Sequence, residues 1–283
     1  MPQYALGKEN GFMKASINQW AFPGEMPAEE AISVVKKLGF EAFEPCVGAG
    51  STIDINATEK EVTAIRAHAD KEGIELCSVG SGLGWKYALG DPDASKQDEA
   101  VAINERVLQI AAWLGAPSVL VVPATVSPEV PYDVALEASL EGVRKLIPAA
   151  ERLKVNIALE NVWNKFLLSP VEMRDFIDQC ESEYVGAYFD TGNIVLYGYP
   201  EQWIRILGSR LCAIHAKDFR ASVGTGGGFV MLMEGDVNWP AVMAALREVG
   251  FDGALTAEFG PYEHSRDVML QHVLASLRAI IAL

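Results

Sequence analysis

Hydrophobic and polar positions follow a repeated order along the chain: a short apolar run, a polar loop and then an amphipathic stretch with helical spacing. The apolar runs show little strict alternation, which is typical of parallel strands covered on both faces. They predict eight strands, at 15–19, 42–46, 75–79, 118–122, 156–160, 186–190, 211–215 and 254–258. The amphipathic stretches predict eight helices, at 28–38, 58–72, 95–114, 132–153, 170–179, 200–207, 236–249 and 265–282.

Eight strands that alternate with eight helices favour a TIM (β/α)₈ barrel, an α/β fold of about this length. An open doubly wound sheet is the alternative, but the glycines at 80–84 lack the spacing of a phosphate-binding turn. We interpret 80–84 as a flexible loop over the barrel mouth, and 224–228 as a similar loop; each is a lid or a plain surface loop. No break in composition divides the chain, so we predict one domain over 1–283, with 1–13 as a leader or cap.

The composition narrows the range of partners. Half of the 283 residues are hydrophobic, and the formal net charge of −15 disfavours a nucleic-acid partner. The N-terminus does not have the pattern of a signal peptide, and the apolar runs are shorter than the ~20 residues that span a bilayer. We therefore expect a cytoplasmic protein without a membrane partner. The four cysteines have no metal-type spacing and are expected to be buried, reduced thiols.

Four successive predicted strands each end on a side chain that can bind a metal: Glu160, Asp190, His215 and Glu258. The active site of a TIM barrel lies at the carboxyl ends of its strands. Three carboxylates gathered there would repel one another, and a divalent cation would offset that repulsion. Singly, each acid could cap a helix or pair with a lysine, and His215 could be a hydrogen-bonded core histidine. Together they predict a site for one ion: Mn²⁺, Mg²⁺, Co²⁺ or Zn²⁺.

The segments around these residues resemble the xylose isomerase-like TIM-barrel superfamily of sugar isomerases and epimerases. The matching stretches are ALENVWNKF, YFDTGNIVLYG, AIHAKDF, EGDVNWPAVMAALREVGFDG and LTAEFG. In the branch that includes ketose 3-epimerases and hexulose-phosphate epimerases, a quartet of this kind binds one metal, usually Mn²⁺, Mg²⁺ or Co²⁺, and for this chain we expect Mn²⁺ first. The resemblance implies that Glu160 and Glu258 are also the catalytic acid/base pair.

The chain departs from tagatose-type epimerases at two places. The loop after Glu160 reads NVWNKFLL, without the further acidic residue of those enzymes, and Asp190 is followed by Thr191, Gly192 and Asn193, where they carry a histidine. We therefore expect a different substrate.

The predicted function is a metal-dependent epimerase or isomerase that acts on a ketose, or a ketose phosphate, through a metal-stabilised enediolate. Two glutamates on opposite sides of the sugar would favour epimerisation, because one removes a proton and the other returns one. The alternatives are a lyase of the inosose-dehydratase type, a hydroxypyruvate isomerase, an apurinic endonuclease and a non-catalytic sugar-binding protein. A homodimer or homotetramer is also compatible with the sequence.

Further candidates for substrate binding follow the strands. Lys217 could bind a substrate hydroxyl or phosphate, or instead pair with Asp218 or Glu258. Glu44 ends the second strand and is either a polar substrate contact or part of an ion pair. The weaker polar candidates are Asn193 and Lys165. Three tryptophans just past strand ends could shape a sugar pocket: Trp20, Trp85 and Trp163.

Overall fold

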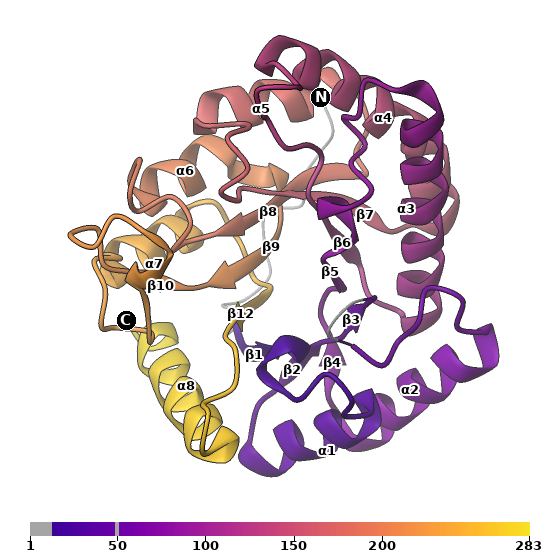
Figure 1. Cartoon of the computed structure of the whole chain (residues 1–283). Helices are drawn as coiled ribbons and strands as arrows, with labels where there is room; N and C mark the ends of the chain where they lie inside the picture. Colours follow the sequence, from indigo (N-terminus) through magenta and orange to yellow (C-terminus); the bar gives the residue numbers. More distant parts are fainter. Residues whose placement is uncertain (1–12, 49–50) are drawn as a thin grey trace.

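The computed structural model describes residues 13–48 and 51–283, and within them it forms a (β/α)₈ barrel (Figure 1). Eight parallel strands form one curled sheet in the order β4-β2-β1-β12-β9-β8-β7-β6. Their bounds are β1 Lys14–Asn18, β2 Ala42–Glu44, β4 Glu75–Leu76, β6 Ser118–Val121, β7 Asn156–Glu160, β8 Val185–Asp190, β9 Leu211–Ala216 and β12 Ala254–Ala257.

The barrel closes through a short bridge between the two outer strands of this sheet. Val79, just past β4, pairs in parallel with Val119 of β6. A second parallel pair, β3 (Cys46–Val47) with β5 (Gly80–Ser81), continues β2 and β4 toward the mouth of the barrel. This closure confirms the predicted barrel and excludes the open doubly wound sheet.

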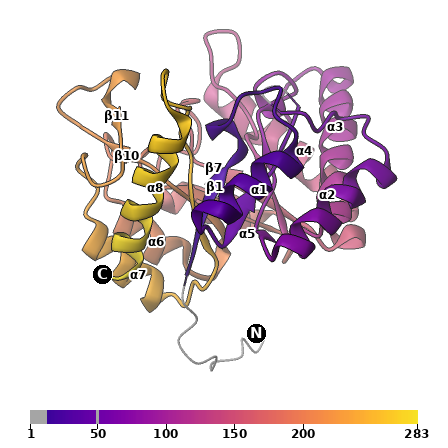
Figure 2. The same ribbon diagram turned by 90° about the horizontal axis from the view of Figure 1, so that it is seen from below.

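In the described part of the chain, eight α-helices surround the strands and cover the outer face of the sheet (Figures 1 and 2). Their bounds are α1 Ala28–Leu38, α2 Glu59–Glu72, α3 Ala94–Leu114, α4 Tyr132–Leu153, α5 Pro170–Gln179, α6 Pro200–Leu207, α7 Trp239–Glu248 and α8 Arg266–Ile281. Polar residues fix several of the starts. Thr58 forms a capping box with Glu61 at α2, while Ser169 and Ser265 cap α5 and α8 through their side chains.

The largest error in the predicted helices is the start of α7. The helix was expected from residue 236, but it begins at Trp239, with Asn238 as its N-cap. The preceding residues instead contact β10 (Asp218–Phe219) and the segment after it: Val237 donates its backbone N–H to the Asp218 carboxylate, and Asp236 accepts from the backbone N–H of Ala221. A carboxylate at a distant position in the sequence therefore holds this segment outside the helix.

The two glycine-rich loops differ in structure. The segment 80–84 is not the flexible loop that we predicted, because Gly80 and Ser81 form the buried strand β5. A Cβ atom at Gly84 would lie 2.7 Å from the carbonyl oxygen of Val122, so this segment packs tightly on the barrel. The segment 224–228 connects β10 (Asp218–Phe219) to β11 (Phe229–Val230) as an exposed hairpin (Figure 2).

The remaining general predictions concern the N-terminus and the cysteines. The predicted leader lies outside the described residues except for Met13, which is buried in the core. The cysteines are free thiols; Cys212 is partly exposed and the other three are buried. Among the described residues, the helices are too short or too polar to cross a membrane.

Candidate metal centre

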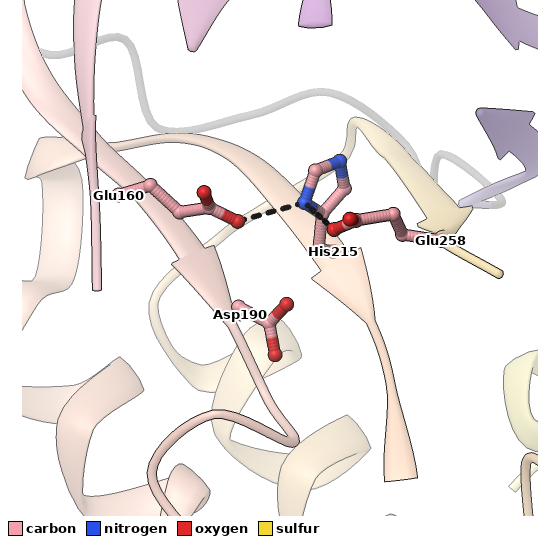
Figure 3. Close-up of side chains that lie close together, drawn as sticks. All are labelled: Glu160, Asp190, His215 and Glu258. Atoms are coloured by element: carbon pink, nitrogen blue, oxygen red, sulfur yellow. Dashed lines mark hydrogen bonds and ion pairs between the residues drawn. The ribbon is translucent and has the colours of Figure 1, made fainter. Parts of the chain in front are cut away.

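The four predicted ligands come from four neighbouring strands and meet at one end of the barrel (Figure 3). Glu160 ends β7, Asp190 ends β8, His215 lies in β9 and Glu258 directly follows β12. The parallel register places Asp190 beside His215. Because these strands are adjacent in the closed sheet, the side chains that end them converge, as the sequence predicted.

His215 is the centre of the cluster. Its Nδ1 atom lies 2.9 Å from Glu160 Oε1 and 2.9 Å from Glu258 Oε2. The two carboxylates approach this nitrogen from opposite sides (Figure 3). One ligand atom from each of the four residues lies within 4.8 Å of the other three. This spacing lets a single ion contact all four side chains.

Asp190 is held by the backbone that follows it. Its Oδ1 atom accepts hydrogen bonds from the backbone N–H groups of Gly192 (2.8 Å) and Asn193 (2.9 Å). The backbone at position 192 lies so close to Lys217 that only glycine fits there, since a Cβ atom would lie 2.7 Å from the Cβ of Lys217. Asn161 fixes the end of the same strand: its side chain donates to the Asp190 carbonyl and accepts from the Asp190 N–H.

The other oxygen of Asp190 makes the cluster a good fit for a cation. Oδ2 is buried, and among the described residues its near partner is the Lys217 ammonium, 3.1 Å away, so this charged oxygen depends on a cation beside it. Three carboxylates and one imidazole provide oxygen and nitrogen donors of the kind that bind Mn²⁺, Co²⁺ and Zn²⁺. The residues present therefore fit a single divalent ion.

Lys217 supplies a positive charge next to these carboxylates. Its Nζ atom lies 2.7 Å from Glu258 Oε2 and 3.1 Å from Asp190 Oδ2. Of the two ion pairs considered from the sequence, the one with Glu258 forms. Asp218 turns away and accepts hydrogen bonds from the backbone of Met233 and from the indole of Trp239.

The two glutamates are in different electrostatic surroundings. Burial raises the pKa of Glu160 to about 7, although its hydrogen bond with His215 opposes this shift. Burial also disfavours the ionised form of Glu258, but the charges of Lys217 and His215 outweigh it and lower the pKa of Glu258 to about 2. With the protein's own charges alone, Glu258 is thus ionised at neutral pH while Glu160 exchanges a proton there.

A cavity of about 550 Å³ opens beside the cluster. Glu258 and Lys217 line it, so a molecule in the cavity would contact one of the candidate ligands, Glu258. Aromatic side chains form other parts of its wall: Trp20, Phe229 and Phe259. The cavity therefore combines a polar end with apolar walls, a combination suited to a sugar. The sequence did not identify Phe229 and Phe259, because Phe229 reaches the cavity only through the β10–β11 hairpin.

The three predicted pocket tryptophans lie in different places. Trp20 lines the cavity. Trp163 stands behind it: its ring packs on Phe229 at 5.3 Å, and its indole donates to the Asn193 carbonyl. Trp85 is 54% exposed, and the structure does not bring it to this cavity.

The other predicted polar contacts do not face the cavity either. Asn193 is buried, and its side chain donates to the carbonyl of Asn161, so it supports the backbone at Asp190. Lys165 is exposed in a loop with a positive φ of 60°. Glu44 is fully buried and contacts His215 Nε2 at 2.9 Å. Of the two roles considered from the sequence, the geometry agrees with the pairing, here with His215, and Glu44 is not among the residues that line the cavity.

The comparison with protein families agrees with this architecture. Residues 32–280 match the family model described as the xylose isomerase-like TIM barrel. The match covers most of the chain, and the protein belongs to this family. The resemblance that the sequence motifs indicated is thereby confirmed, together with the fold.

Solved structures with the same fold include several sugar epimerases. A D-psicose 3-epimerase of Clostridium cellulolyticum H10, solved with D-tagatose, superposes with a TM-score of 0.78 at 21% identity, over 95% of this chain and 99% of that one. An L-ribulose 3-epimerase gives a TM-score of 0.80 at 15% identity, over 95% of each chain. The IolI protein with a bound zinc atom gives a TM-score of 0.80 at 16% identity, over 95% of this chain and 98% of that one. At these identities, the likeness shows a shared fold.

A curated relative matches a shorter part of the chain. The uncharacterized protein MJ1311 of Methanocaldococcus jannaschii is 25% identical over 129 residues, which are 44% of this chain and 43% of that protein. The match thus spans less than half of the relative's length.

Proposed function

We propose that the protein is a divalent-metal-dependent sugar epimerase or isomerase that acts on a ketose or ketose phosphate. The observation that carries this proposal is the placement of Glu160 and Glu258 on either side of His215 Nδ1, each 2.9 Å from it, with Glu258 also lining the adjacent cavity. The epimerases among the structural neighbours support the proposal by their fold.

The residues of this site can carry out proton exchange next to a carbonyl group. Glu258, which is held ionised by Lys217, would remove a proton from one face of the substrate. Glu160, with a pKa near 7, would return a proton to the other face. Inversion at one carbon needs two such groups, whereas transfer of a proton between neighbouring carbons can use one. The pair therefore favours epimerisation.

A divalent ion held by Glu160, Asp190, His215 and Glu258 would supply Lewis-acid stabilisation of the negative charge that develops on the substrate's oxygens. Mn²⁺ is our first choice for this ion, since three carboxylates outnumber the single imidazole. Zn²⁺ is the second, in view of the zinc-bound neighbour. We place the enzyme in the cytoplasm, where its free thiols would stay reduced.

The proposal is tested by incubating the protein with free and phosphorylated ketoses in the presence of Mn²⁺. Chromatography and proton NMR would identify C3 and C4 epimers, aldoses and dehydration products. We expect a C3 or C4 epimer that fails to form when EDTA removes the ion. An enone product would instead indicate the lyase alternative, and turnover that EDTA leaves unchanged would contradict the metal dependence.

A further inference from the structure

Glu44 makes a second polar cluster beneath the candidate metal centre. Its carboxylate is fully buried in the barrel, and both oxygens are occupied. Oε1 accepts a hydrogen bond from Asn18 Nδ2 and contacts His215 Nε2 at 2.9 Å. Oε2 accepts from the hydroxyl groups of Ser78 and Tyr188. These partners come from β1, the segment after β4, β8 and β9, so the carboxylate joins strands on different sides of the barrel.

The surroundings of Glu44 determine which groups donate. The side chain of Asn18 has a fixed orientation, because its Oδ1 atom accepts from the backbone N–H of Trp20 at 2.7 Å. Its amide nitrogen therefore faces Glu44 and can only donate. An ionised carboxylate can only accept. The remaining contact of Oε1, with His215 Nε2, is thus satisfied when that nitrogen carries a proton.

This arrangement orients the histidine. A proton on Nε2 leaves Nδ1 as the nitrogen with a free lone pair once an ion is present, and Nδ1 is the atom that Glu160 and Glu258 approach. Tyr188 also packs on the imidazole, with ring centroids 4.3 Å apart, and limits its rotation. Metal-binding histidines commonly donate their second ring N–H to a carboxylate that fixes their tautomer and direction.

We propose that Glu44 is the positioning residue of the metal centre: it holds the Nε2 proton of His215 and thereby directs Nδ1 toward Glu160, Asp190 and Glu258. This inference rests on the proposed metal-dependent function and adds to it a residue that touches neither the ion nor the substrate. It replaces the direct substrate contact that the position of Glu44 at a strand end suggested.

The test compares the Mn²⁺ affinity of two variants by isothermal titration calorimetry. Glu44→Gln removes the charge that holds the Nε2 proton with little change in volume, and we expect its Kd for Mn²⁺ to rise about 10- to 100-fold. Tyr188→Phe is the matched control, because it removes one donor to the same carboxylate but keeps the ring against His215. Its Kd should stay within about threefold of the wild type. Equal losses in both variants, or an unchanged affinity in Glu44→Gln, would overturn the proposal.

A second measurement needs no folded variant. In ¹⁵N-histidine-labelled wild-type protein without added metal, we expect an imidazole proton on Nε2 of His215 that exchanges slowly with water, since both partners are buried. Its absence would overturn the role of Glu44, whatever the variants do. If the wild type bound no divalent ion but retained this proton, the proposed function would fail while the pairing of Glu44 with His215 stood.

Discussion

The ammonium group of Lys217 and the carboxylate of Glu258 lie 2.7 Å apart, and the same ammonium lies 3.1 Å from Asp190 Oδ2. The positively charged Lys217 side chain therefore already pairs with two of the candidate metal ligands, Glu258 and Asp190. When a divalent ion binds, these carboxylates must be shared between the two cations. Lys217 would then limit the affinity of the site and help to stabilise it before the ion arrives.

Replacement of this lysine should separate the two effects. Lys217→Met is expected to bind Mn²⁺ about tenfold more tightly, because a repelling charge is removed. In EDTA the same variant should lose on the order of 3 kcal/mol in its free energy of unfolding, since buried carboxylates are left without a partner. Calorimetry and urea unfolding measure the two quantities. Lys165→Met, at an exposed position, is the control; weaker Mn²⁺ binding in Lys217→Met would refute the competition.

Asp190 should be essential for holding the ion. Asp190→Asn keeps the shape of the side chain but removes the negative charge that Asp190 would offer to the ion. We expect the Mn²⁺ affinity to fall at least about 100-fold, as is usual when a charged ligand is lost from a site of this kind. Glu234→Gln is the control, because Glu234 lines the cavity but does not belong to the cluster. Similar affinities in the two variants would place the ion elsewhere.

The two-base mechanism predicts different behaviour for inversion and for proton exchange. Glu160→Gln and Glu258→Gln should each slow epimerisation by about 10²- to 10⁴-fold at saturating Mn²⁺. The intact glutamate would still exchange the substrate proton on its own face with D₂O. Proton NMR of the substrate in D₂O measures both processes. If either variant inverted its substrate at nearly the wild-type rate, a single base would be sufficient.

The raised pKa of Glu160 predicts how stability depends on pH without a metal. Its pKa is about 7 in the folded protein and 4.5 as the ordinary value, so the unfolded chain releases this proton at lower pH. The contribution of protonated Glu160 to the free energy of unfolding is therefore complete below pH 4.5 and is lost as the pH rises toward 7. In EDTA, the wild type should lose on the order of 1–3 kcal/mol relative to Glu160→Gln between pH ~5 and ~7.5. Urea unfolding at several pH values measures this difference, and parallel curves would contradict the prediction.

Gly192 should tolerate no side chain. A Cβ atom there would lie 2.7 Å from Lys217 Cβ, and overpacking of this kind costs about 1–3 kcal/mol. Gly192→Ala should therefore unfold at a lower urea concentration than the wild type and bind Mn²⁺ more weakly, because Asp190 would shift. Gly226→Ala is the control, since no atom of residues 13–48 and 51–283 lies within 4 Å of a Cβ atom at that position. Equal stabilities of the two variants would show that the backbone at Gly192 yields easily.

The barrel and its four candidate ligands could be predicted because they depend on local patterns. Each strand is a short apolar run, and each ligand stands where such a run ends, as Asp190 and His215 do. Parallel strands bring equivalent positions together, so the sequence order alone placed these side chains at one end of the barrel.

The roles of the remaining residues could not be predicted, because they depend on how the barrel closes. Glu44 ends its strand much as Glu160 does, but closure surrounds it with partners from four other parts of the barrel, and it does not line the cavity. Phe229 reaches the cavity through a hairpin whose shape depends on bonds to Asp218. Trp85 does not line the cavity. The strand before it continues as β5 to Ser81, and Trp85 ends the short turn that follows.

The central claim is that one divalent ion is held jointly by Glu160, Asp190, His215 and Glu258. Anomalous diffraction from a crystal of the protein grown with MnCl₂ tests it most directly. The account predicts a single manganese peak within about 2.0–2.4 Å of one atom from each of the four side chains, with Nδ1 as the atom from His215. A map without manganese at this cluster, or with the ion bound elsewhere while the four side chains keep their contacts with Lys217 and Glu44, would contradict it.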